Sequence, residues 1–360
     1  MIYFDNAATT SPITAPQVFH NPSSPHALGI KAERALRHSR KIISNVLSSP
    51  SCQAAPEEII FTSGGTESNN LAILGYSLSN MRHNAGLASA PHEHPSILAP
   101  IRFAQEQNWA HATSLGTSSG PVLVCISHVN HETGDINDIE AIAADIKKNN
   151  PASVIFVDGS QGFCKEKISL RNIDMYSFSG HKCHGPIGTG GLWVKKGLRL
   201  TPLQHGGGQE DGRRSGTENV PAIIQMAEAA DIMHKNFTAN HDHVAKIKLI
   251  LLSLKDSLPN VEINSLSGHV TPYILNMSFL GIKGEILVHA LSEKNIYVSM
   301  GAACRSRKRA KPALELMGFA PEIAASAIRF SFSPCSTLQE AEQALPVIIQ
   351  TVNQLRRLIR

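Results

Sequence analysis

Apolar residues along the first two thirds of the chain alternate between strand-like runs and helix-like spacing. Short apolar runs of the kind found in buried strands occupy residues 58–62, 86–90, 121–126, 153–157, 173–178 and 191–194. Helical spacing, with apolar residues three and four positions apart, occupies residues 30–48, 66–80, 95–107 and 138–148. Strands that alternate with helices in this way predict an α/β fold, in which helices cover a mainly parallel sheet.

The pattern changes after residue 220. Two helical segments, 220–235 and 239–257, lead to strands expected at 261–265, 274–279, 296–299 and 328–333, with helices between them. This part of the chain predicts a second, smaller α+β domain. We therefore expect a large domain at 14–257 and a small domain made of residues 1–13 and 258–360.

The composition is that of a folded globular protein. Of the 360 residues 42% are hydrophobic, and 33 Lys and Arg against 29 Asp and Glu leave a net charge of +4. That charge is too small to indicate binding to nucleic acid or to a membrane. No run of about 18 apolar residues is present, and the first residues, MIYFDNAATTSP, lack the basic and apolar regions of a secretion signal. A cytoplasmic location is the simplest expectation.

The six cysteines are scattered along the chain without a CxxC pair. Their spacing indicates neither a disulfide framework nor a zinc ribbon, so we expect free thiols and no bound metal.

A glycine-containing turn joins the predicted strand at 58–62 to the helix at 66–80. It carries Ser63, Gly64, Gly65 and Thr66. Backbone N–H groups and the positive end of a helix dipole suit a phosphate at such a turn, although an ordinary strand-to-helix loop has the same pattern. The turn lacks the GxxxxGK[ST] sequence of a nucleotide P-loop, which disfavours a triphosphate.

Two further predicted strands end at residues that can take part in catalysis or ligand binding. Asp158 ends the strand SVIFVD, with Gln161 three residues later, and Ser179, His181 and Lys182 follow the strand IDMYSFS. Ligands of open α/β sheets bind at the carboxyl ends of the strands, and a lysine in a partly dry pocket can form a Schiff base. A phosphate site, an acid and a lysine together match pyridoxal phosphate, its ring-nitrogen partner and its Schiff-base lysine.

The same residues permit two other interpretations. Ser179 and Lys182 form an SxxK sequence, as in serine acyl-enzymes, but the Ser-Asp-Asn and Lys-Thr-Gly elements that accompany it are missing. The clusters His92/His94 and His181/Cys183/His184 could hold a metal, but their spacing matches no zinc pattern.

Two candidates lie in the C-terminal part. In IRFSFS, Arg329 falls on the polar face of an alternating strand, where its guanidinium suits a carboxylate or pairs with a structural acid. Cys304 follows a predicted strand, among small residues, and is flanked by Arg305, Arg307, Lys308 and Arg309. Nearby positive charge favours the thiolate, so Cys304 is the best nucleophile candidate of the six cysteines.

With these residues in place, the chain resembles the cysteine desulfurases of the class V aminotransferase family, in the NifS/IscS-like group. The resemblance covers nearly the whole length through DNAATT, NPSSPHALG, FTSGGTESNN, HEHPS, HVNHETG, VDGSQ, SFSGHK, HGGGQEDGRRSGTEN, GAAC and IRFSFS in family order. It implies the pyridoxal-phosphate fold type I, with a seven-stranded large domain, a small domain carrying the catalytic cysteine loop, and a homodimer.

The resemblance also implies a role for each matching residue. Cys304, Lys182 and His94 are expected to be catalytic, and Arg329 and Asn130 to bind the substrate. The residues expected to bind the cofactor are Gly65, Thr66, His94, His131, Asp158, Gln161, Ser179, His181, Lys182 and Thr217. Among them, Asp158 would pair with the pyridine nitrogen, His94 would stack on the ring and move protons, and Thr217 would reach the phosphate of the partner subunit.

The implied reaction converts L-cysteine to L-alanine and leaves a persulfide on Cys304, which passes sulfur to an acceptor protein. Iron–sulfur assembly, tRNA thiolation and thiamine sulfur supply all remain open as destinations. A pyridoxal-phosphate aminotransferase or a selenocysteine lyase would share every feature except dependence on Cys304, and a non-enzymatic sulfur carrier would need neither Lys182 nor cofactor. We expect no membrane and no direct nucleic-acid partner.

Three features differ from the usual family pattern. His131 stands where relatives have a cofactor-contacting asparagine, and the loop after Cys304, RSRKRAK, is strongly basic. That loop is either solvated or docks an acidic partner or an RNA-bound acceptor. The chain stops at Arg360, so the tail with which scaffold-serving members dock is expected to be absent.

Overall fold

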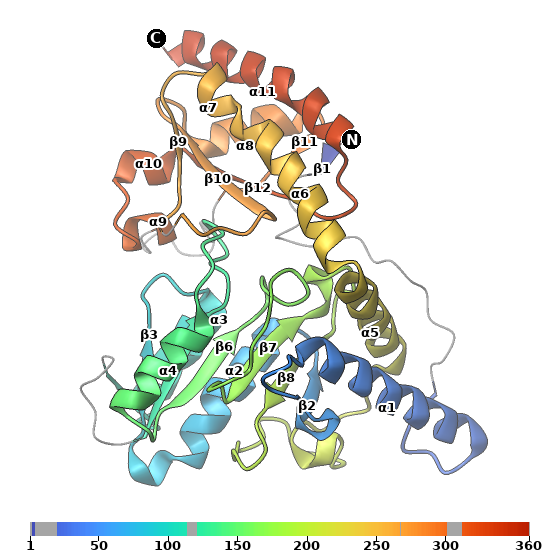
Figure 1. Cartoon of the computed structure of the whole chain (residues 1–360). Helices are drawn as coiled ribbons and strands as arrows, with labels where there is room; N and C mark the ends of the chain where they lie inside the picture. Colours follow the sequence, from blue (N-terminus) through green and yellow to red (C-terminus); the bar gives the residue numbers. More distant parts are fainter. Residues whose placement is uncertain (1, 4–19, 114–120, 267, 301–311, 360) are drawn as a thin grey trace. The chain divides into compact units, whose positions relative to one another are not determined.

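The structure is a computed structural model that describes residues 2–3, 20–113, 121–266, 268–300 and 312–359 (Figure 1). The chain divides into two compact units. The larger unit comprises Ser11–His128 and Asn137–Lys235, and the smaller comprises Met1–Thr10, Val129–Ile136 and Asn236–Arg360. Among the described residues, none of the helices is long and apolar enough to cross a membrane.

A seven-stranded sheet forms the centre of the larger unit, in the order β2-β8-β7-β6-β5-β3-β4. Its strands are β2 (Ile59–Thr62), β3 (Gly86–Ser89), β4 (His111–Ala112), β5 (Val122–Ser127), β6 (Val154–Asp158), β7 (Met175–Ser179) and β8 (Gly190–Val194). Strand β8 is antiparallel to its neighbours β2 and β7, and the other pairs are parallel. The predicted fold class, α/β with a mainly parallel seven-stranded sheet, is confirmed.

Helices cover both faces of this sheet. They are α1 (Ala27–Leu47), α2 (Gly65–Ser79), α3 (Pro95–Glu106), α4 (Ile139–Asn149) and α5 (Val220–Lys235), with short 3-10 turns η1 (Pro56–Glu58), η2 (Met81–His83), η3 (Gly180–Lys182) and η4 (Glu210–Gly212). Helix α1 begins three residues before the predicted start at 30, because the His26 side chain accepts a hydrogen bond from the Gly29 N–H at 3.2 Å and caps the helix.

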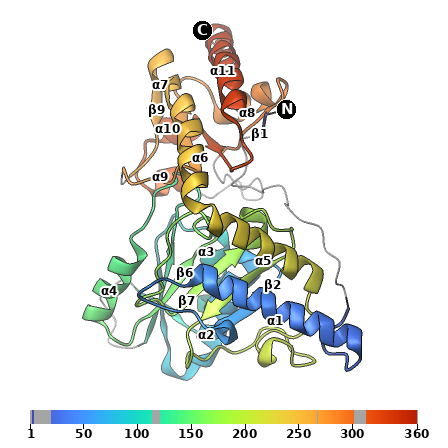
Figure 2. The same cartoon turned by 45° about the vertical axis from the view of Figure 1, so that its right-hand side comes forward.

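The side chains of a strand alternate between its two faces and pack into two separate apolar cores. In β6, Ile155 and Val157 join an apolar cluster with residues of α1, α4 and α5, whereas Phe156 joins a cluster with residues of α2 and α3. Successive side chains of a strand point to opposite faces, so both faces of this strand are buried. Helices α1 and α5 lie side by side (Figures 1 and 2).

The smaller unit contains a three-stranded antiparallel sheet in the order β12-β10-β9, and a parallel pair of β1 with β11. The strands are β1 (Ile2–Tyr3), β9 (Val261–Ile263), β10 (Ile274–Phe279), β11 (Ile296–Tyr297) and β12 (Ala327–Ser331). The helices are α6 (Phe237–Leu252), α7 (Leu254–Ser257), α8 (Gly284–Ser292), α9 (Ala313–Leu316), α10 (Pro321–Ala325) and α11 (Leu338–Ile359).

The division of the chain differs from the predicted one at two places. Helices α6 and α7 belong to the smaller unit, because Val244, Ile247, Leu251 and Leu254 pack in one apolar cluster with the strands β10 and β12 and with α11. The segment Val129–Ile136 also belongs to it, and Asp135 accepts hydrogen bonds there from the Ser265 hydroxyl and the Leu266 N–H.

Candidate functional site

Four strands of the larger unit deliver predicted site residues to one edge of the sheet. Strands β3, β6 and β7 run in the same direction, and β2 shares that direction because β8 is antiparallel to both β2 and β7. Asp158 is the last residue of β6, and the segments after β2, β3 and β7 carry Gly65, His94 and Lys182. This is the edge at which open α/β sheets bind their ligands.

The turn after β2 has a geometry that needs glycine. Gly64 has φ 151° and ψ −179°, a conformation that L side chains rarely adopt. A Cβ atom on Gly65 would lie 2.6 Å from the Ser160 hydroxyl oxygen and 3.5 Å from the Ser179 Cβ. Thr66 follows in the exposed first turn of α2. The helix N-terminus is therefore held against the loops after β6 and β7, with the backbone bare enough for a phosphate.

Asp158 is buried at the end of β6, with 7% of its surface exposed. Its Oδ2 accepts a hydrogen bond from Asn69 Nδ2 at 2.8 Å, and its Oδ1 accepts one from the Ser160 N–H at 2.9 Å. Both oxygens thus face donors, which is the environment that an ionised carboxylate requires. Such a carboxylate suits the protonated nitrogen of a pyridine ring. Asn69 is not among the residues predicted from the sequence.

Gln161 follows in the turn after β6, and a buried lysine lies beside it. The Lys165 ammonium donates a hydrogen bond to Gln161 Oε1 at 3.4 Å, and Lys165 is only 3% exposed. Lys165 is also absent from the sequence prediction. Its spacing of four residues from Gln161 is the only signal in the sequence that could have suggested it.

Ser179, His181 and Lys182 lie together where β7 ends and η3 begins. Burial, together with the positive charges of Lys182 and Lys165, lowers the pKa of His181 to about 4. His181 is therefore neutral near pH 7, and a neutral imidazole can donate an N–H to a phosphate oxygen. Gly180 sits between them, where a Cβ atom would lie 2.4 Å from the Thr189 hydroxyl oxygen.

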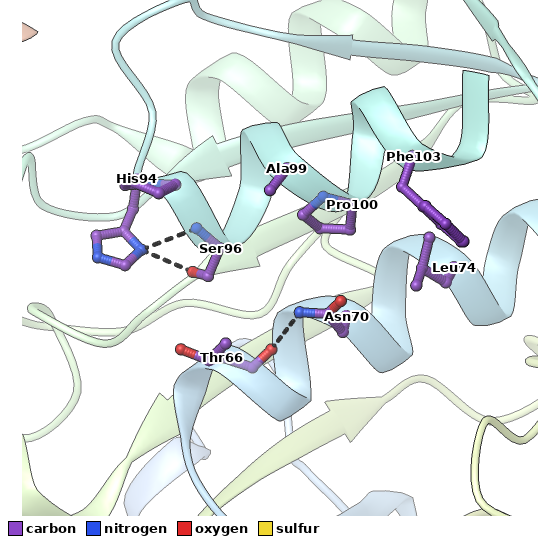
Figure 3. A pocket seen from close by; sticks show the side chains of 9 residues that line it. Thr66, Asn70, Leu74, His94, Ser96, Ala99, Pro100 and Phe103 are labelled. Carbon is purple, nitrogen blue, oxygen red and sulfur yellow. Dashed lines mark hydrogen bonds between the residues drawn. The ribbon is translucent and has the colours of Figure 1, made fainter. Parts of the chain in front are cut away.

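His94 caps the N-terminus of α3. Its Nδ1 accepts a hydrogen bond from the Ser96 N–H at 3.1 Å and lies 2.7 Å from the Ser96 hydroxyl oxygen. His94 and Thr66 line one end of a pocket of about 570 Å³, and Leu74 and Phe103 line the other end between α2 and α3 (Figure 3). The pocket thus brings two predicted cofactor residues from different loops together.

Glu93, beside His94, is a second buried acid near Asp158. It is 6% exposed, and its Oε1 accepts a hydrogen bond from the Ser127 N–H at 3.1 Å. Burial, with a smaller contribution from the negative charge of Asp158, raises the pKa of Glu93 to about 7, against the hydrogen bond from Ser127. Its position follows from the sheet, because Ser127 of β5 pairs with Asp158 of β6.

The groups at this edge match the parts of pyridoxal phosphate. Gly65 and Thr66 at the start of α2, with Ser179 and the neutral His181, suit the phosphate, and Asp158 suits the ring nitrogen. At Gly65 and Gly180 neighbouring side chains occupy the space that a Cβ atom would need, so both positions are closely packed. The donor set and the cradle therefore fit this cofactor.

Three further predicted residues lie in the smaller unit. Asn130 Oδ1 accepts hydrogen bonds from the Glu132 N–H at 2.8 Å and the Thr133 N–H at 3.0 Å, so this side chain shapes its own turn. Arg329, on β12, is 7% exposed and donates from Nη1 to the His131 carbonyl oxygen at 2.6 Å. Arg329 thus contacts His131 at its backbone carbonyl group.

Thr217 lies on the exposed loop between η4 and α5. Arg214 connects this loop to α2, because its Nε donates to Glu67 Oε1 at 2.7 Å. Cys304 and the basic residues after it lie outside the described residues. In the part of the chain that the structure describes, no group of three or more His, Cys, Asp or Glu residues is arranged to hold a metal ion.

Comparison with protein families gives a match over almost the entire chain. The profile of the family described as Aminotransferase class-V matches residues 2–344. Among curated proteins, a NifS/IcsS protein homolog of Lactobacillus delbrueckii subsp. bulgaricus is 36% identical, with 95% of each chain covered. A protein named cysteine desulfurase IscS, from Buchnera aphidicola subsp. Baizongia pistaciae, is 34% identical over 99% of this chain and 94% of its own.

Solved structures agree with this similarity. A structure titled as a NifS-like protein superimposes with a TM-score of 0.88 at 30% identity, covering 98% of this chain and 99% of its own.

Proposed function

Because the chain belongs to the class V aminotransferase family and is a pyridoxal-phosphate-dependent cysteine desulfurase, we propose that Cys304 accepts the sulfur of L-cysteine as a persulfide. The observation that carries this proposal is the arrangement of Gly65, Asp158 and Lys182 at strand ends on one edge of the sheet, in a chain similar over its full length to named desulfurases.

The cofactor residues divide by the part of the cofactor that each would hold. Lys182 would bind the aldehyde, Asp158 the ring nitrogen and Gln161 the phenolic oxygen. The phosphate would be held by Gly65, Thr66, Ser179 and His181, and by Thr217 of a second copy, which is why we propose a homodimer. When bound, the cofactor supplies an electron sink for the substrate carbon atoms.

The residues of the chain perform the remaining steps. Arg329 binds the substrate carboxylate through its guanidinium, with Asn130 beside it in the same unit. The thiolate of Cys304 attacks the sulfur of the substrate, and the carbon–sulfur bond breaks with its electron pair left on carbon. Lys182 and His94 carry the protons that complete alanine, and Cys304 retains the sulfur as a persulfide.

We further propose that an acceptor protein of iron–sulfur assembly or thiolation takes the outer sulfur atom of the Cys304 persulfide, and that this transfer occurs in the cytoplasm. The basic segment after Cys304 is the candidate docking element. Exchanging its five basic residues for Ser should slow the transfer of sulfur to an acidic acceptor more than it slows alanine formation. An unchanged rate of sulfur transfer would show that the basic segment does not dock the acceptor.

A single assay tests the central proposal. The purified, cofactor-loaded protein is incubated with L-cysteine, and alanine, sulfide and protein-bound persulfide are measured. Cys304→Ser should lose persulfide and sulfide release, and Lys182→Ala should lose turnover. Cys335→Ser is the matched control, because Cys335 is an exposed free cysteine that is not among the predicted site residues. Equal sulfide release from Cys304→Ser would contradict the persulfide step and favour a lyase.

A further inference from the structure

One hydrogen-bond network connects two residues of the proposed site that lie on different loops. Asn69, on α2, donates through Nδ2 to Asp158 Oδ2 and to the Ser96 hydroxyl oxygen, both at 2.8 Å. The Ser96 oxygen lies 2.7 Å from His94 Nδ1. Asn69, Ser96 and Asp158 are all buried, with Asn69 only 1% exposed. Asp158 and His94 are therefore connected through two intermediate groups, the Asn69 amide and the Ser96 hydroxyl.

The donors in this network have a fixed direction. The Ser177 hydroxyl donates to Asn69 Oδ1 at 2.6 Å, which identifies the oxygen side of the amide. The two protons of Asn69 Nδ2 then point to the Asp158 carboxylate and to Ser96. Because the Ser96 oxygen accepts from Asn69, the hydroxyl proton is directed to the remaining neighbour, His94 Nδ1.

The backbone gives the same direction at His94. The Ser96 N–H can only donate, and it donates to His94 Nδ1 at 3.1 Å. Figure 3 shows Nδ1 turned toward Ser96 and the other ring nitrogen turned away. A neutral histidine whose Nδ1 accepts carries its proton on Nε2.

We propose that Asn69 is a positioning residue that, through Ser96, holds His94 in the tautomer with its proton on Nε2 and couples that choice to the carboxylate of Asp158. The inference rests on the proposed function, since it specifies the atom at which His94 gives and regains a proton. In this arrangement Nε2 is the proton donor, and Nδ1 is occupied by the cap of α3. A change at Asp158 reaches His94 through the Asn69 amide and the Ser96 hydroxyl.

Nitrogen NMR of the cofactor-loaded enzyme, labelled with ¹⁵N-histidine, tests this inference. The His94 signals are assigned as those absent from His94→Gln. The wild type should show Nδ1 as an acceptor and Nε2 protonated. Asn69→Ala removes the donor to Ser96 and should shift the tautomer ratio about fivefold toward Nδ1–H, the effect of one lost hydrogen bond. The same variant should bind pyridoxal phosphate about tenfold more weakly, because Asp158 loses a donor.

Ser96→Ala is the second variant and removes one hydroxyl only, so it decides the question if Asn69→Ala does not fold. It should shift the ratio in the same direction, and the double variant should add little to either single variant. Ser77→Ala is the matched control, because Ser77 is a buried residue of α2 that donates to the Ile73 carbonyl within the same helix.

An unchanged His94 tautomer in both Asn69→Ala and Ser96→Ala would overturn the inference. Alanine formation by the wild type, measured on the same sample, separates this outcome from failure of the proposed function. If alanine forms and the tautomer is unaffected by both variants, only the role of Asn69 is wrong.

Discussion

Lys165 directs its ammonium group to the side-chain oxygen of Gln161, over 3.4 Å, inside the larger unit. The interaction identifies the carbonyl side of the Gln161 amide, and the other side is the NH₂ donor. Gln161 is the residue proposed to bind the phenolic oxygen of the cofactor.

Replacing Lys165 with Met should therefore weaken cofactor binding without lowering stability. Loss of the hydrogen bond to Gln161 is worth about 1 kcal/mol, or roughly a fivefold higher Kd for pyridoxal phosphate. A buried charge replaced by an apolar side chain of similar volume is often neutral or stabilising. Cofactor titration followed by absorbance, together with thermal denaturation, measures both effects. In a Gln161→Ala background the same replacement should have little effect on Kd, and an undiminished effect there would rule out action through Gln161.

Glu93 should make stability depend on pH in an identifiable window. Its pKa is about 7 in the folded protein and 4.5 as an unperturbed carboxyl, so the folded state retains its proton to higher pH. The stabilisation is complete below about pH 4.5 and is lost as the pH rises through 7. Glu93→Gln, which cannot ionise, should gain stability relative to the wild type between pH 5 and pH 8, by up to about 3 kcal/mol.

Urea denaturation of both proteins at the two pH values measures this difference. Glu262→Gln is the matched control, because Glu262 is an exposed residue of β9. A gap between wild type and Glu93→Gln that is the same at both pH values would contradict the prediction.

The ion pair of Arg40 and Glu210 should stabilise the larger unit far more than its surface counterpart on the same helix. Arg40 donates to both carboxylate oxygens of Glu210, at 2.8 and 2.7 Å, and the Glu210 side chain is 1% exposed. Arg40→Met leaves a buried carboxylate and should cost about 3 kcal/mol of unfolding free energy.

Arg37→Met provides the comparison for this ion pair, because Arg37 pairs with Glu33 one helical turn earlier on α1, with 77% of its side chain exposed. That change should cost less than about 0.5 kcal/mol. Chemical denaturation compares the two, and the double variant Arg40→Met/Glu210→Gln should recover part of the loss. Similar costs at the two arginines would show that burial of Glu210 does not decide the outcome.

Gly65→Ala should weaken cofactor binding through a steric conflict that a second change can relieve. The added methyl would lie 2.6 Å from the Ser160 hydroxyl oxygen, so the loop after β6 must shift. Overpacking of this kind costs about 1–3 kcal/mol, which corresponds to a Kd roughly tenfold higher or more. In a Ser160→Ala background the hydroxyl oxygen is gone and the penalty should largely disappear. Equal penalties in both backgrounds, measured by cofactor titration, would exclude this contact as the cause.

The strand ends of the site could be predicted because their signals are local. The strand that ends at Asp158 is almost wholly apolar, and a polar residue directly after such a run marks the end of the strand. The glycines at 64 and 65 likewise mark a turn from composition alone. The local sequence pattern therefore predicts Gly65, Asp158 and Lys182 as site residues, and the order of the strands explains why they share one edge of the sheet.

Asn69 could not be identified in this way. Asn69 and Asn70 are adjacent and chemically identical, yet Asn69 is buried against Asp158 whereas Asn70 is only half-buried and donates to the Thr66 carbonyl of its own helix. The rotation of α2 about its axis decides between them, and that rotation depends on packing against the sheet. The burial of Glu93 and Lys165 depends in the same way on neighbours that are distant in sequence.

The segment Val129–Ile136 has a consequence for how the protein can be made. During synthesis Asp135 leaves the ribosome long before Ser265, which is its hydrogen-bond partner and follows it by 130 residues. The smaller unit therefore cannot finish folding as a C-terminal piece on its own, and a gene fragment that starts at Asn236 would lack eighteen of its residues, those of Met1–Thr10 and Val129–Ile136. The smaller unit is built from three stretches of chain, so no cut at a single peptide bond separates it whole from the larger unit.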